Sequence, residues 1–69
     1  MKLVECYSGI EYAERPRALV WNGTQYKIAK IQARWLTPEE KYFRVQTVSN
    51  REFILCYKHR IDTWEIMPG

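Results

Sequence analysis

The sequence has 69 residues, so we expect a single domain over residues 1–69 with little core to spare. Hydrophobic residues make up 46% of it and aromatic residues 14%, enough for a packed core that needs neither a metal nor several disulfides. The net charge of +3 and the pI of about 9.0 exclude a histone-like excess of positive charge, and they are compatible with a nucleic-acid partner without requiring one.

The compartment is predicted from the first residues and from the two cysteines. Glu5 interrupts the apolar stretch after the N-terminal Met-Lys, so we expect no signal peptide, and no segment is apolar over the length that a membrane span needs. A cytoplasmic protein follows by default, with Cys6 and Cys56 reduced. Contact between the two thiols across strands is one alternative, and two separate small hydrophobic residues are the favoured one.

The first predicted elements are a short strand over residues 3–7 and a long β-hairpin over residues 15–35. The hairpin turns at Asn22-Gly23, the dipeptide that most readily takes the two positive φ values of a type I′ turn. This turn predicts a register that pairs Trp21 with Thr24, Leu19 with Tyr26, and Arg17 with Ile28. The apolar members of these pairs then share the core face.

Strict alternation fails in the second strand of this hairpin, because continuing it past Ile28 would turn Lys30 inward. One β-bulge near Ala29-Lys30 shifts the phase. With the new phase, the following apolar residues take the inner face: Ile31, Ala33 and Trp35. Such a bulge also bends a strand sharply, which lets one strand of a small barrel serve two sheets.

Residues 37–40 carry the pattern of a helix N-terminus. Thr37 is a suitable N-cap, Pro38 suits the first helical position, and Glu40 completes a capping box. We expect a single helical turn there, because a strand pattern resumes at Lys41.

The rest of the chain alternates with period two in further strands. A loop of about three residues at 49–51 is predicted to pair Thr47 with Phe53, Val45 with Leu55, and Phe43 with Tyr57. A loop of about four residues, His59 to Asp62, then sets Trp64 opposite Tyr57. The alternation turns the following residues outward: Tyr42, Arg44, Ile54 and Met67.

A run of five or six consecutive short antiparallel strands with tight turns must bury one face. We therefore predict an all-β fold, a small SH3-like barrel with one short helical turn. The three tryptophans, Trp21, Trp35 and Trp64, are expected on its core face.

No set of residues in the sequence predicts catalysis or a cofactor. His59, the only histidine, falls in a predicted turn without a Ser or Cys placed for it to activate. Two cysteines and one histidine at these separations fit no zinc pattern, and the three glycines form no phosphate-binding loop. We therefore expect a non-catalytic binding module with no cofactor and no metal.

A run of five positive charges without an acid lies between Arg15 and Trp35. Outward residues of this run and of the next strand predict a basic, partly aromatic face made of Lys27, Lys30, Arg34, Tyr42 and Arg44. Arg17 is expected to join it, because its place opposite Ile28 sets its stem near the core edge while its charged head reaches water. Such a face predicts weak binding of single-stranded nucleic acid without sequence preference, because rings stack bases while Lys and Arg follow the phosphates. The alternatives are an ordinary solvated face and a protein-interaction module that uses an edge strand or a loop groove, which the outward Ile54 and Met67 favour.

Much of the chain after Arg15 resembles a bacterial family of small proteins of unknown function. The matching motifs are Arg15-Pro16, an apolar run that ends in Trp21, the turn glycine Gly23, the Tyr-x-Ile at Tyr26, Trp35, the Tyr-Phe-Arg-Val-x-Thr stretch from Tyr42 to Thr47, and the closing Trp64-Glu65-Ile66. Members of that family are often encoded near genes for Y-family, error-prone DNA polymerases. The resemblance implies a partner in a DNA-transaction complex and assigns no active site.

Overall fold

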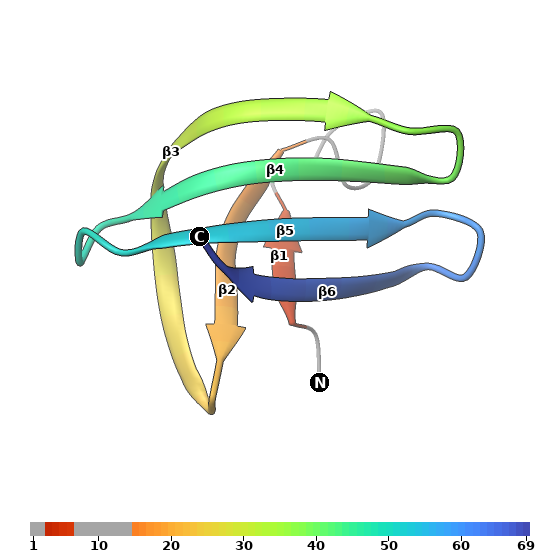
Figure 1. Ribbon diagram of the computed structural model, residues 1–69. Coiled ribbons are helices and arrows are strands. Elements are labelled where there is room, and N and C mark those ends of the chain that lie inside the picture. The colour runs from red at the N-terminus through yellow and green to blue at the C-terminus, as the bar shows by residue number, and fades with distance from the viewer. Residues whose placement is uncertain (1–2, 7–14) are drawn as a thin grey trace.

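The computed structural model describes residues 3–6 and 15–69, and these form an all-β fold, as predicted (Figure 1). The strands are β1 (Val4–Cys6), β2 (Pro16–Trp21), β3 (Thr24–Leu36), β4 (Glu40–Thr47), β5 (Glu52–Lys58) and β6 (Thr63–Pro68). All neighbours are antiparallel, and the sheet order follows the chain from β1 to β6. The predicted end of the first strand at Tyr7 lies outside the described residues. No helix that is long and apolar enough to cross a membrane occurs in the described part of the chain.

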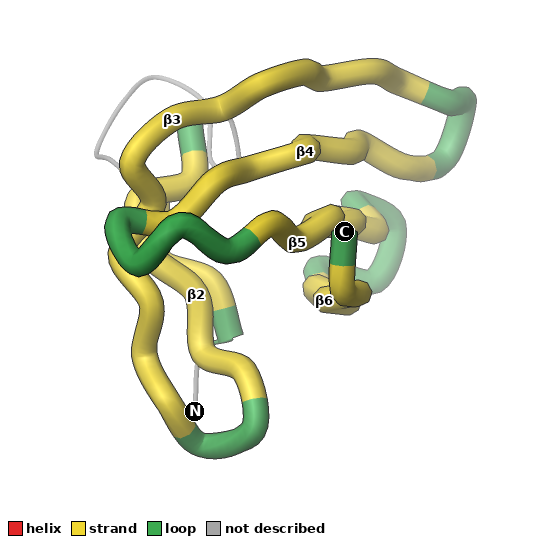
Figure 2. Tube along the Cα trace, turned by 60° about the vertical axis from the view of Figure 1, so that its left-hand side comes forward, coloured by secondary structure: helices red, strands yellow, loops and turns green. Residues whose placement is uncertain are grey.

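The strand β3 curls the sheet into a half barrel. Its first part, up to Lys27, pairs with β2, and its second part, from Ile28 to Leu36, pairs with β4. The register with β4 shifts between Ile28 and Lys30 and again between Ile31 and Ala33. The first shift confirms the predicted bulge, and the second was not predicted. Because bulges bend and twist a strand, β1, β2 and the start of β3 cross the direction of β4, β5 and β6 (Figures 1 and 2).

The second bulge reverses the faces of the residues that follow it. Trp35 lies opposite Tyr42 on the outer face and is 42% exposed, so the prediction of an inward Trp35 is wrong. Ala33 also takes the outer face, against the prediction, and is exposed. Arg34, predicted to point outward, instead lies opposite the fully buried Phe43, on the inner face of the sheet.

The hydrophobic core lies between the two crossing halves of the sheet. Its fully buried members are Val4, Leu19, Phe43, Val45, Phe53 and Leu55. Trp21 and Trp64 pack against this cluster from the inner face, as predicted, although both are only half-buried. The core therefore draws on β1, β2, β4 and β5, while β3 and β6 contribute partly buried side chains at its margin.

The last predicted hairpin register is confirmed, and the first is confirmed from Trp21 opposite Thr24 to Ala18 opposite Lys27. The predicted pair of Arg17 with Ile28 is not part of the ladder, because Ile28 pairs with Thr47 of β4 instead. Leu19 pairs with Tyr26 around the Asn22-Gly23 turn, where both turn residues have positive φ values, 50° and 78°. Tyr57 pairs with Trp64 across the loop that ends at Asp62. Asp62 also has a positive φ, and it accepts a hydrogen bond of 2.6 Å from the Tyr57 hydroxyl.

The predicted helical turn at residues 37–40 does not form. The capping bond is present, since the Glu40 N–H donates to Thr37 Oγ1 at 3.0 Å. The Thr37 N–H, however, donates to the Glu40 carbonyl at 2.9 Å, which closes a β-hairpin loop. Pairing of β3 with β4 extends to this loop and determines its conformation, so the capping pattern serves a hairpin instead of a helix.

The predicted register between β4 and β5 is wrong by two residues. Val45 pairs with Phe53 and Phe43 pairs with Leu55, because the turn is closed between Thr47 and Arg51 and is therefore centred one residue earlier than the predicted loop at 49–51. A shift of two residues keeps every side chain on its predicted face. The outward positions of Ile54 and Met67 are accordingly confirmed, and these two residues are partners across β5 and β6.

Candidate functional site

Two aromatic rings stack on the outer face of β3 and β4. The indole of Trp35 and the ring of Tyr42 lie 5.2 Å apart between centroids and are nearly parallel, with an interplanar angle of 2°. The alternation of β4 turns Tyr42 outward, as predicted, and the second bulge in β3 brings Trp35 beside it. Tyr42 covers one side of the indole, and the exposed remainder of Trp35 offers a flat aromatic surface to a ligand.

A carboxylate next to this stack holds the Tyr42 ring in place. Tyr42 donates a hydrogen bond of 2.9 Å to Glu40 Oε1, and the Cys56 thiol donates one of 3.4 Å to Glu40 Oε2. The bond to Glu40, followed by one to Cys56, raises the pKa of Tyr42 to about 12. Burial and the same carboxylate raise the pKa of the Cys56 thiol. Both groups therefore stay protonated at neutral pH and donate to one acceptor.

This carboxylate yields a prediction on the titration of Tyr42. Replacing Glu40 with glutamine is expected to lower the Tyr42 pKa from about 12 toward its ordinary value of 10.0, because the charged acceptor is gone. The folded-state pKa lies above the unfolded one, so the stability from this bond is fully present below pH 10 and is lost as the pH rises through about 12. Phenolate absorbance during alkaline titration measures the shift, with Tyr42→Phe identifying the band. An unchanged titration in Glu40→Gln would contradict the assignment.

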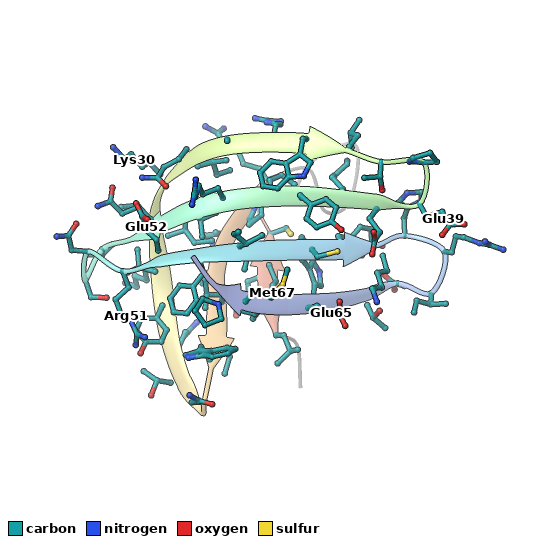
Figure 3. The ribbon with its side chains drawn as sticks, in the orientation of Figure 1. Lys30, Glu39, Arg51, Glu52, Glu65 and Met67 are labelled. Carbon is teal, nitrogen blue, oxygen red and sulfur yellow. The ribbon has the colours of Figure 1, made fainter. Side chains whose placement is uncertain are left out.

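Positive side chains gather in a pocket of about 330 Å³ where β2 and β3 diverge. Its lining residues are Arg15, Pro16, Ile28, Ala29, Lys30, Ile31 and Arg34. Figure 3 places Lys30 at the bend of β3. None of the described residues that line the pocket is acidic, so the positive charges of Lys30 and Arg34 suit an anion with several oxygens. We refer to this feature as the cationic pocket.

The structure separates the predicted basic residues into different places. Lys30 and Arg34 line the cationic pocket together with Arg15, which belongs to the acid-free run but was not among the predicted site residues. Arg17 donates to Glu5 Oε2 at 2.9 Å, so an acid from β1 neutralises its charge. Lys27 lies opposite Ala18, on the half of the sheet that β2 and the start of β3 form.

The outer face of β4 carries the remaining predicted residues. Arg44 lies next to Tyr42 on the same face and is exposed, opposite Ala33 of β3. This face is not free of acids, because Glu52 of β5 accepts a hydrogen bond of 3.1 Å from Gln32. The sequence run from residue 15 to 35 lacks acids, but strand pairing brings one to it from elsewhere in the chain.

Comparison with known protein families, with curated proteins and with solved structures found no match for this chain.

Proposed function

We propose that this protein is a non-catalytic module that binds single-stranded nucleic acid weakly and without sequence preference. The proposal depends chiefly on one observation: Arg34, which lines the cationic pocket, is followed directly along β3 by Trp35, whose indole is exposed on the other face. Phosphate oxygens match the positive charges of Lys30 and Arg34, and an unpaired base stacks on the indole. A duplex keeps its bases stacked inside the helix and offers no free ring face to Trp35.

The alternating directions of the side chains along β3 suggest how one nucleic-acid strand reaches both the cationic pocket and Trp35. Arg34 and Trp35 are neighbours in the sequence and point to opposite faces of β3. Beyond Lys30, β3 pairs with β4, and no other described strand pairs with its second edge. A single strand that crosses this edge places a phosphate in the pocket and a base against Trp35.

The expected affinity is modest because few groups take part. Stacking of a base on one aromatic side chain contributes about 1–3 kcal/mol. About two or three neutralised phosphates give a slope of about −1.4 to −2.1 for the logarithm of the binding constant against the logarithm of the salt concentration. The dissociation constant is therefore expected to be micromolar or weaker at physiological salt.

The proposal also covers the type of barrel, the cellular compartment and the complex in which the protein acts. The bent β3, which serves both halves of the sheet, supports an SH3-like interpretation of the half barrel. The resemblance to a bacterial family encoded near error-prone polymerases supports a cytoplasmic role in a DNA-transaction complex. Single-stranded DNA is the nucleic acid that such a complex exposes.

Titration of a labelled oligothymidylate at low salt tests the proposal. Trp35→Ala is expected to weaken binding by about tenfold, since a lost stack of about 1.4 kcal/mol corresponds to that factor. Combining Lys30→Glu with Arg34→Glu is expected to weaken binding at least as much and to flatten the salt dependence. A duplex of the same length is expected to show no dependence on Trp35.

The control variant makes the same change in net charge at the other end of the sheet. It combines Lys58→Glu with Arg60→Glu, two residues that line a separate pocket near the β5–β6 loop. Binding within about twofold of the wild type is expected for it, because neither residue lines the cationic pocket or stacks on Trp35, and Lys58 reaches the stack only through Glu40 on the opposite strand. Absence of wild-type binding at low salt, or equal losses in both double variants, would overturn the proposal.

A further inference from the structure

The strand β6 presents a long open edge. It stands last in the sheet, and β5 is the one described strand that pairs with it. The register runs without a shift from Lys58 opposite Thr63 to Phe53 opposite Pro68. Figure 1 shows β6 as an extended arrow at the margin of the sheet, so it has the regular geometry that a further strand needs.

The backbone groups on this edge are identified by one hydrogen bond. The Gly69 N–H donates to the Glu52 carbonyl at 3.0 Å, so these residues form a hydrogen-bonded pair. In an antiparallel ladder every second residue of a strand belongs to a hydrogen-bonded pair. Counting back by twos from Gly69 reaches Glu65, so the N–H of Glu65 points toward β5. The N–H and carbonyl groups of Trp64 and Ile66 therefore point away from β5, toward the open edge.

The other open edges carry features that discourage strand addition. The β1 edge is short and has a register shift at Glu5. The open part of β3 has two bulges and carries Lys30 and Arg34. Bulges and Lys side chains are devices that protect natural edges. The edge of β6 has neither, and its only proline is Pro68 at the very end.

The side chains along β6 define the chemistry of a matching strand. Trp64 and Ile66 face inward, half-buried against the core, so the residues opposite them should be apolar. Glu65 and Met67 face outward, as Figure 3 shows, and Met67 is 40% exposed next to Ile54. Glu65 forms an ion pair of 3.2 Å with Lys58 of β5 through Oε1, and its side chain is still 58% exposed. A further cation opposite Glu65 can share this carboxylate, and an apolar residue suits the position opposite Met67.

A second copy of this chain fits the edge poorly. Pairing Trp64 of one copy with Ile66 of the other uses all the open backbone groups, and it sets Glu65 opposite Glu65 of the second copy. Directly opposed like charges destabilise a strand pair. The ion pair with Lys58 offsets part of this charge in each copy. A Lys or Arg from a partner adds attraction at this position where a second Glu65 adds repulsion, so Glu65 favours a cationic partner strand over self-pairing.

We propose that the edge of β6 binds an extended segment of another protein by strand addition, with apolar residues opposite Trp64 and Ile66 and a Lys or Arg opposite Glu65. This interaction is separate from nucleic-acid binding, because Trp35 and the cationic pocket lie on β3. Trp35→Ala is therefore expected to leave it unchanged.

The test uses a capped peptide, acetyl-Ile-Val-Lys-Val-Thr-amide, titrated into the full chain and followed by amide NMR. Exchange of the Trp64 and Ile66 amides is expected to slow at least tenfold at saturation. Those of Arg34 and Leu36, on the open edge of β3, should not change. A matched peptide with Glu in place of Lys is expected to bind about fivefold more weakly, and Glu65→Lys should reverse this preference.

Several results would overturn the proposal. One is slow exchange of the Trp64 and Ile66 amides in the dilute chain without peptide, which means that the edge is already covered. Another is protection that grows with protein concentration alone, which identifies a second copy as the occupant. Peptide effects confined to β3, or no preference between the Lys and Glu peptides, would also contradict it.

Discussion

Phe43→Ala is expected to remove most of the stability of the fold. The side chain is fully buried at the centre of the core cluster and packs against Trp64, with 6.0 Å between ring centroids. Truncating a buried Phe costs about 3–5 kcal/mol, as lost transfer free energy and as a cavity that neighbours only partly refill. A single domain of this size has a total stability of about the same order, so a large unfolded population follows.

Thermal and denaturant unfolding, followed by circular dichroism, measure this effect. Each kcal/mol lowers the melting temperature of a domain this small by about 4–8 °C. The matched control is Trp35→Ala, which removes a larger aromatic side chain from the outer face. Its expected cost is about 0.5–1.5 kcal/mol, the contribution of its stack on Tyr42. Equal losses in the two variants would contradict the face assignment of β3.

The contrast between these residues marks where sequence patterns predict this fold and where they do not. Period-two alternation assigns Phe43 and Leu55 to the inner face, because both strands run across the core along most of their length. The end of β3 is different, since β2 leaves it after Lys27 and no described strand covers its inner face as far as Leu36. Burial therefore does not decide which side chains at the end of β3 point inward. The spacing of apolar residues predicted the wrong face for Trp35 for this reason.

The candidate site was predictable in its local parts and not in its long-range ones. The acid-free run pointed to Lys30 and Arg34, which the fold brings into one pocket. The neutralisation of Arg17 by Glu5 depends on the pairing of β1 with β2, which the hairpin pattern alone does not specify. The approach of Glu52 to Gln32 depends in the same way on the order of β3, β4 and β5.

The loop between β4 and β5 shows how one buried hydroxyl determines a register. Thr47 is 2% exposed, and its Oγ1 accepts a hydrogen bond of 3.0 Å from the Arg51 N–H. The Thr47 N–H donates to the Arg51 carbonyl at 2.8 Å, and the Asn50 N–H donates to the Thr47 carbonyl at 2.9 Å. These bonds close the loop from Thr47 to Arg51, so strand pairing begins with Gln46 opposite Glu52. A period-two pattern fits Val45 opposite Leu55 and Val45 opposite Phe53 equally well, because both registers keep every side chain on the same face. The pattern alone therefore could not predict the observed register.

Thr47→Val is therefore expected to destabilise the fold by about 1–2 kcal/mol, because valine keeps the shape of threonine and leaves the Arg51 N–H without its acceptor. Thr47→Ser is the control, since it keeps the hydroxyl and loses only a methyl group, worth about 0.8 kcal/mol. Denaturant unfolding compares the stabilities, and amide exchange at Arg51 reports the bond itself. Faster exchange of this amide in the valine variant, with slow exchange kept in the serine variant, is the expected result. If valine proved at least as stable as serine, the backbone bonds alone would determine the loop, and the hydroxyl would have no part in selecting the register.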